Sequence, residues 1–127
     1  PAVPVHIDAP PDVHLDVDRA IHTGLIVNEL VTNALKHAFG PGVRGEIRVR
    51  VRGLDGRLEL QVQDNGRGLP ANFSVEETRS LGLRIVHILA RRLGATVRIE
   101  TGGGATFTVE FPLEAEEWNT PYPPRPC

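Results

Sequence analysis

The stretch LIVNELVTNALKHAF, residues 25–39, decides the fold of this chain. Within it, apolar pairs and polar pairs alternate every four residues, so each kind of pair falls on its own face of a helix. The polar pairs are Asn28-Glu29, Thr32-Asn33 and Lys36-His37. The apolar face predicts packing against a sheet. The helix is predicted to begin after an N-cap at Asp16 or Asp18 and to end near Phe39.

The polar face of this helix contains residues that a solvated helix seldom uses. Asn and Thr are weak helix formers, whereas exposed helix faces are commonly built from Glu, Lys and Arg. Asn28, Thr32 and Asn33 in the helix interior therefore indicate a binding function, with an ordinary solvated face as the alternative.

Composition limits the classes of protein to which the chain can belong. Its 127 residues suffice for one domain with its own hydrophobic core. With a net charge of −2 and no apolar run long enough to span a bilayer, we expect neither nucleic-acid binding nor membrane contact by this domain. Cys127 is the only cysteine, which excludes a disulfide framework and fits a reducing, cytoplasmic setting.

Alternation of apolar and polar residues predicts strands before and after this helix along the chain. Such strands are expected near residues 3–7, 47–52, 58–63, 97–99 and 106–111, with a further short strand at Val13 and Leu15. The turn at residues 53–56 makes a hairpin of two of them. In the first hairpin strand, Arg48, Arg50 and Arg52 are expected on a solvated face, paired with Glu59 and glutamines, rather than in an anion site.

A second helix is predicted between Leu81 and Leu93. Its apolar side is expected to comprise Ile85, Val86, Leu89 and Leu93. Together these elements predict an α/β fold, a two-layer sandwich in which helices cover one face of a mixed, mostly antiparallel sheet. We expect the domain to occupy residues 1–113 and the acidic, then Pro-rich residues 114–127 to form a mobile tail.

Two glycine-containing segments add possible ligand contacts. By strand parity Asp64 faces the helices, where its carboxylate needs a donor such as an adenine amino group. Gly66 and Gly68 permit close approach of a ligand, although a plain Asp-Asn-Gly turn is the alternative. Gly82 lies in the first turn of the predicted second helix. The N-terminus of a helix can bind phosphate there, and an ordinary helix start without a ligand is the alternative.

The three segments occur in a characteristic order: Glu29-x-x-x-Asn33, then Asp64-x-Gly66-x-Gly68, then Leu81-Gly82-Leu83. In this combination the chain resembles the ATPase superfamily of gyrase, the ninety-kilodalton heat-shock chaperone, histidine kinases and mismatch-repair proteins. Residues 25–39 resemble the N box of short-lid, HWE-like bacterial sensor histidine kinases. Residues 80–94, SLGLRIVHILARRLG, resemble their final glycine box. The resemblance covers roughly residues 3–113 and implies a Bergerat-type ATP-binding fold.

The resemblance also implies roles for individual residues. The N-box asparagine that binds Mg²⁺ corresponds to Asn33, and the acidic catalytic position corresponds to Glu29. Asp64 matches the residue that reads adenine. The other residues expected to bind ATP are Lys36, His37, Gly66, Gly68, Gly82 and Leu83.

The sequence departs from the family pattern at two positions. Ser80 stands where many kinases have glycine, and Ala105 stands where a threonine usually helps to hold adenine. Parity places Ala105 on the inner face and Thr106 on the outer face, so Thr106 is not expected to substitute, and adenine loses one contact. None of the five histidines lies in a recognisable phosphoacceptor motif.

Three functions are compatible with these features. The first is the catalytic domain of a protein-histidine kinase, which transfers the γ-phosphoryl group of ATP to a histidine on the kinase's own dimerisation domain, upstream of a response regulator. The second is a serine kinase that resembles anti-sigma factors. The third is a nucleotide-binding module without catalysis, which the pairing of Glu29 with Asn33 disfavours.

Overall fold

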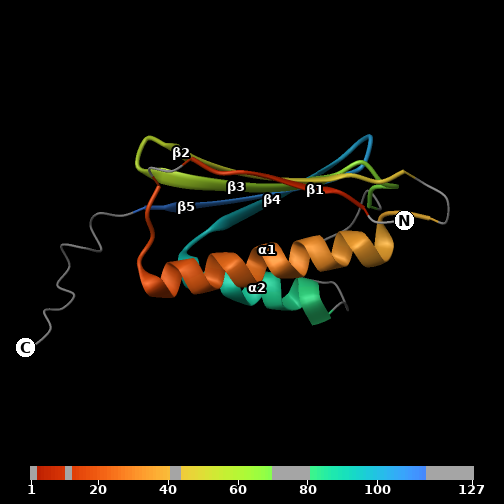
Figure 1. Ribbon diagram of the computed structural model, residues 1–127. Helices are drawn as coiled ribbons and strands as arrows, with labels where there is room; N and C mark the ends of the chain where they lie inside the picture. Colours follow the sequence, from red (N-terminus) through yellow and green to blue (C-terminus); the bar gives the residue numbers. More distant parts are fainter. Residues whose placement is uncertain (1–2, 11–12, 41–43, 70–80, 114–127) are drawn as a thin grey trace, which may run out of the picture.

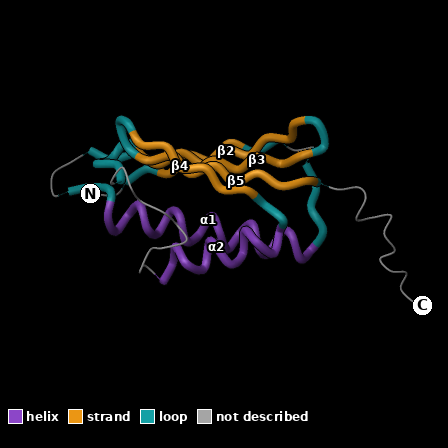
Figure 2. The backbone as a smooth tube through the Cα atoms, turned by 180° about the vertical axis from the view of Figure 1, so that it is seen from behind, coloured by secondary structure: helices purple, strands orange, loops and turns teal. Residues whose placement is uncertain are grey.

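The computed structural model describes residues 3–10, 13–40, 44–69 and 81–113. Its elements are β1 (Val5–Asp8), α1 (Val17–His37), β2 (Ile47–Leu54), β3 (Arg57–Asp64), α2 (Leu81–Leu93), β4 (Thr96–Thr101) and β5 (Ala105–Pro112) (Figure 1). Both helices lie side by side on one face of the sheet, as the reverse view in Figure 2 also shows. The predicted two-layer α/β sandwich is confirmed.

The sheet has five strands in the order β1-β2-β3-β5-β4. β1 is parallel to β2, and the other three neighbouring pairs are antiparallel, so the sheet is mixed and mostly antiparallel as predicted. The short strand predicted at Val13 and Leu15 is wrong. These residues belong to no strand, and their side chains pack against the core, which accounts for their apolar pattern without a strand partner.

Local signals set the limits of α1. The Asp16 side chain accepts a hydrogen bond from the Arg19 N–H at 2.9 Å, so Asp16 is the N-cap. The helix ends at His37 with Ala38 as its C-cap, one to two residues before the predicted end at Phe39. Lys36 and His37 lie in the last turn, where positive charge is favourable to the helix dipole. No helix in these described segments is both long and apolar enough to cross a membrane.

The core lies between the sheet and the two helices. α1 contributes Ile26, Leu30 and Ala34, and β3 contributes the alternating residues Leu58, Leu60 and Val62. In α2 the fully buried residues are Leu83, Val86, Ala90 and Leu93. The predicted inner residues Ile85 and Leu89 are only partly buried. The buried face of α2 is therefore rotated about the helix axis relative to the predicted face, because α2 packs against α1 as well as against the sheet.

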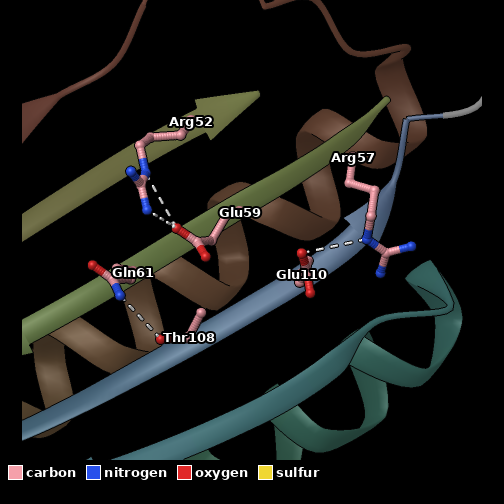
Figure 3. Close-up of polar contacts among 6 residues, drawn as sticks. All are labelled: Arg52, Arg57, Glu59, Gln61, Thr108 and Glu110. Carbon is pink, nitrogen blue, oxygen red and sulfur yellow. Dashed lines mark hydrogen bonds and ion pairs between the residues drawn. The ribbon is translucent and has the colours of Figure 1, made fainter. Parts of the chain in front are cut away.

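The outer face of the sheet is polar and held by cross-strand pairs (Figure 3). Arg52 pairs with Glu59 at 2.7 Å and Arg57 with Glu110 at 3.4 Å. Arg48, Arg50 and Arg52 are all exposed, which confirms the solvated arginine row. Such exposed pairs each contribute about 0–1 kcal/mol to stability.

Thr108 also lies on this outer face, yet it is only 1% exposed. It is opposite Gln61 on β3 and Arg98 on β4, and its Oγ1 is 3.3 Å from Gln61 Nε2 (Figure 3). Because β5 is an interior strand with a neighbour on each side, the longer side chains of Gln61 and Arg98 cover Thr108.

Candidate functional site

Two cavities lie along the polar face of α1 and share Asn33 and His37 in their walls. The first, of about 280 Å³, is lined by Glu29, Thr32, Asn33, Lys36, His37, Leu81, Gly82 and Ile85. The second, of about 260 Å³, is lined by Asn33, Ala34, His37, Ala38, Asp64, Arg67, Gly68, Leu69, Ala105 and Phe107. Because they share a wall, the cavities can accept two ends of one elongated ligand.

The first cavity combines an acid, a carboxamide and two basic side chains. Glu29 and Asn33 are one helical turn apart and both are partly buried, whereas Lys36 and His37 are exposed at the end of the helix. Across from them, α2 contributes Gly82 in its first turn. This arrangement suits a polyanion, with positive charge from the Lys36 side chain in the last turn of α1 and from the N-terminus of α2.

The donor set of the first cavity fits Mg²⁺. This cation prefers oxygen ligands and takes few of them from protein when phosphate and water can complete its shell. Asn33 offers a carboxamide oxygen, and Glu29 offers a carboxylate on the same cavity wall. Over the residues that the structure describes, no cluster of three His, Cys, Asp or Glu side chains could hold a metal alone. One carboxamide and one carboxylate would leave the other positions of such a metal to phosphate and water.

Asp64 is the buried acid of the second cavity, at 7% exposure. Its Oδ1 accepts hydrogen bonds from the Gly66 N–H at 2.8 Å and the Ala105 N–H at 3.2 Å. Those two bonds join the loop after β3 to the start of β5. The second carboxylate oxygen, Oδ2, makes no hydrogen bond to any described residue, so it can accept one from a ligand.

Gly66 lines neither cavity, and its backbone approaches protein rather than an open site. A side chain there would collide with the carbonyl of Ala38 at the end of α1. The next residue, Arg67, donates its N–H to that same carbonyl at 2.9 Å. Close packing of the loop on α1 explains this glycine, and a direct contact between Gly66 and a nucleotide stays a prediction.

Gly68 does line the second cavity, and it has a left-handed backbone with φ of 78°. A side chain there would approach Thr101 Oγ1 at 2.5 Å. Thr101 Oγ1 also accepts a hydrogen bond from the Leu69 N–H at 3.3 Å. The loop at residues 66–69 is therefore held by α1 on one side and by β4 on the other.

The remaining predicted site residues divide between cavity and core. Gly82 lines the first cavity, whereas Leu83 is 3% exposed and belongs to the core. Ala105 is buried, lines the second cavity beside Asp64 and faces inward, which confirms the parity argument. Ser80 and the predicted tail lie outside the described residues.

Sequence reasoning missed several residues of the cavity walls. They include Ile85, Arg67, Leu69 and Phe107. Thr32 lines the first cavity and belongs to the polar face that indicates a binding function, although the resemblance gave it no role. Ile85 and Phe107 follow core patterns, and nothing in the local sequence distinguishes an apolar cavity wall from a packed interior.

Comparison with known proteins assigns the fold to a family. Residues 18–115 match the family described as Histidine kinase-, DNA gyrase B-, and HSP90-like ATPase. Blue-light-activated histidine kinase 2 of Erythrobacter litoralis is 35% identical over 118 residues, which cover 91% of this chain and 34% of that protein. Sensor histidine kinase PdtaS of Mycobacterium tuberculosis is 43% identical over 76 residues, which cover 59% of this chain and 15% of that protein.

Solved structures agree with this assignment. The blue-light-activated histidine kinase of Erythrobacter litoralis superposes with a TM-score of 0.84 at 34% identity, over 93% of this chain and 37% of that chain. The chain spans about a third of the length of the first of these curated relatives. It belongs to the family of histidine kinase-, DNA gyrase B- and HSP90-like ATPases, and the relatives compared above are histidine kinases.

Proposed function

We propose that this chain binds Mg-ATP across the two cavities and donates the γ-phosphoryl group to a histidine on the dimerisation domain of its own kinase. The observation that carries the proposal is the shared wall at Asn33 and His37, which joins a cavity of about 260 Å³ holding Asp64 to a cavity holding Glu29 and Lys36. A response regulator would then receive the phosphoryl group, in a cytoplasmic two-component pathway.

In this proposal the base occupies the cavity around Asp64. Asp64 Oδ2 accepts a hydrogen bond from the adenine amino group, while Oδ1 keeps the loop in place. Ala105 offers no side-chain hydroxyl beside Asp64, so adenine is held by one contact fewer than a threonine would allow. Gly68 leaves room for the nucleotide at the edge of the cavity.

The phosphates occupy the other cavity. Lys36 and His37 lie near them, and Asn33 binds Mg²⁺, which neutralises the charge of the phosphates. Gly82 and the backbone of Leu83, at the start of α2, complete the phosphate contacts. Glu29 orients or deprotonates the accepting imidazole as the γ-phosphoryl group transfers, because it lies one turn from Asn33 on the same cavity wall.

Asn33→Ala is expected to abolish the strengthening of ATP binding by Mg²⁺, because the variant loses the protein's oxygen ligand to the metal. Calorimetric titration with ATP, with and without Mg²⁺, measures this effect. Asn28→Ala is a matched control, since Asn28 is an exposed asparagine on the same helix and lines neither cavity. Equal strengthening by Mg²⁺ in wild type and Asn33→Ala would remove Asn33 from the metal site.

The isolated domain is expected to bind ATP without labelling itself, because transfer requires the accepting nucleophile in line with the γ-phosphorus. Adding the matching dimerisation domain should produce label on that partner. Incubation with radiolabelled ATP, followed by acid and alkali treatment, tests this. Phosphohistidine is lost in acid and survives alkali. Acid-stable, alkali-labile label on a serine would instead support the serine-kinase alternative.

A further inference from the structure

The inner face of β1 is not covered by the helix layer. Val5 and Ile7 lie opposite Ile47 and Val49 on β2 and share their face of the sheet. Ile47 and Val49 are 0% and 3% exposed, whereas Val5 and Ile7 are 40% and 70% exposed. β1 therefore carries two apolar side chains that lie beyond the edge of the helix layer, whereas that layer buries the matching residues of β2.

The other edge of the sheet differs. β4 is covered by α2, and its inward residues Val97 and Ile99 are partly buried. An edge strand with uncovered apolar residues is a template for pairing with another strand. Of the two edges, β1 is the one that still has apolar surface to bury.

The hydrogen-bond pattern of β1 directs the backbone N–H and C=O groups of Val5 and Ile7 away from β2. The Ile47 N–H donates to the carbonyl of Pro4 at 3.1 Å, which sets the parity of the parallel ladder with β2. In such a ladder alternate residues direct both backbone groups to the same neighbour. His6 and Asp8 therefore bond to β2, and the N–H and C=O groups of Val5 and Ile7 point to the open edge.

We infer that this edge pairs with the same edge of a second copy of the chain, in an antiparallel ladder centred on Ile7. In that register Ile7 of each copy faces Ile7 of the other and exchanges two backbone hydrogen bonds. Val5 lies opposite Ala9. On the outer face, the His6 side chain of each copy, whose Nε2 lies 3.2 Å from Glu46 Oε2 of its own copy, is opposite Asp8 of the other, so a polar pair of imidazole and carboxylate forms twice.

The cross-strand side-chain pairs and the face on which each side chain lies favour this register over registers shifted by one residue. A shift by one residue would place the apolar residues opposite the polar outer face. A register centred on His6 would place two imidazoles opposite each other. β1 itself spans only Val5–Asp8, so the ladder is short and covers residues 5–9.

The resulting association is weak and reversible. So short a ladder buries less surface than the roughly 1,200 Å² at which stable interfaces begin, which corresponds to a transient contact. The two-fold axis crosses the sheet, so one continuous sheet spans both copies with all helices on the same face. This geometry does not depend on the proposed nucleotide chemistry, because β1 lines neither cavity.

Disulfide trapping tests the register. Ile7→Cys, in a background in which Cys127 is replaced by Ser, places two thiols across the two-fold axis at a Cα separation of about 5.5 Å, within disulfide range. Val5→Cys is the matched control, because the two copies of residue 5 would lie about four residues apart along the ladder, roughly 13 Å. Mild oxidation is expected to dimerise Ile7→Cys and to leave Val5→Cys monomeric.

Two outcomes of this trapping would overturn the inference: equal cross-linking of the two variants, or preferential cross-linking of a His6→Cys variant.

A second measurement needs no cysteine. Ile7→Pro removes an N–H that points to the open edge and leaves the bonds between β1 and β2 intact. Analytical ultracentrifugation at high protein concentration should show weak dimers of wild type and at least tenfold weaker association of Ile7→Pro, with a similar melting temperature. Monomeric wild type, or unchanged association of Ile7→Pro, would also overturn it.

Discussion

Asp64→Asn is expected to weaken ATP binding by about 1.5–3 kcal/mol, which is roughly ten- to a hundredfold or more in Kd. The asparagine can keep the Oδ1 contacts to the Gly66 and Ala105 N–H groups, so the loop should retain its position. It replaces Oδ2 by an amide NH₂, which would place a donor against the adenine amino donor. The substitution therefore removes the proposed base contact and spares the two internal bonds.

Calorimetric titration with ATP and GTP measures this effect. Wild type is expected to prefer ATP, and Asp64→Asn should lose most of that preference. Asp64→Ala serves as the comparison, since it also removes the bonds to Gly66 and Ala105 and should lower the melting temperature. If Asp64→Asn binds ATP as tightly as wild type, Asp64 does not read the base.

Glu29→Ala is expected to slow phosphoryl transfer to the partner histidine by about 10²–10⁴-fold, the usual contribution of a general base. ATP affinity should fall much less, because Lys36, Asn33 and Asp64 supply the binding contacts in the proposal. Glu29 is partly buried and lines the same cavity as Lys36, which brings it close to the proposed phosphates.

Single-turnover transfer with the matching dimerisation domain separates rate from binding. Glu29→Gln keeps the shape and hydrogen-bonding capacity of the side chain, so a variant that recovers most of the rate would point to orientation rather than proton transfer. Asn28→Ala, next in sequence but outside both cavities, should transfer at the wild-type rate. If Glu29→Ala loses affinity and rate equally at low ATP, with its saturated rate unchanged, Glu29 contributes only uniform binding.

The sequence by itself determined the features that depend on near neighbours. The four-residue repeat of residues 25–39 and the N-cap at Asp16 specified α1, because helix periodicity and capping involve residues within one turn. Alternation in β2, β3 and β5 specified which side chains face the helices, including Asp64 and Ala105. Most of the proposed site was therefore predictable, since its residues lie on these elements.

The tertiary structure decided what depends on contacts between distant segments. Gly66 is required by its contact with Ala38, and Thr108 is buried because β5 is an interior strand with a neighbour on each side. Val5 and Ile7 alternate like core residues but remain exposed, because the helices do not extend beneath β1. An alternating pattern indicates which residues of a strand share one face of the sheet. Only the packing of the layers determines whether another element covers that face.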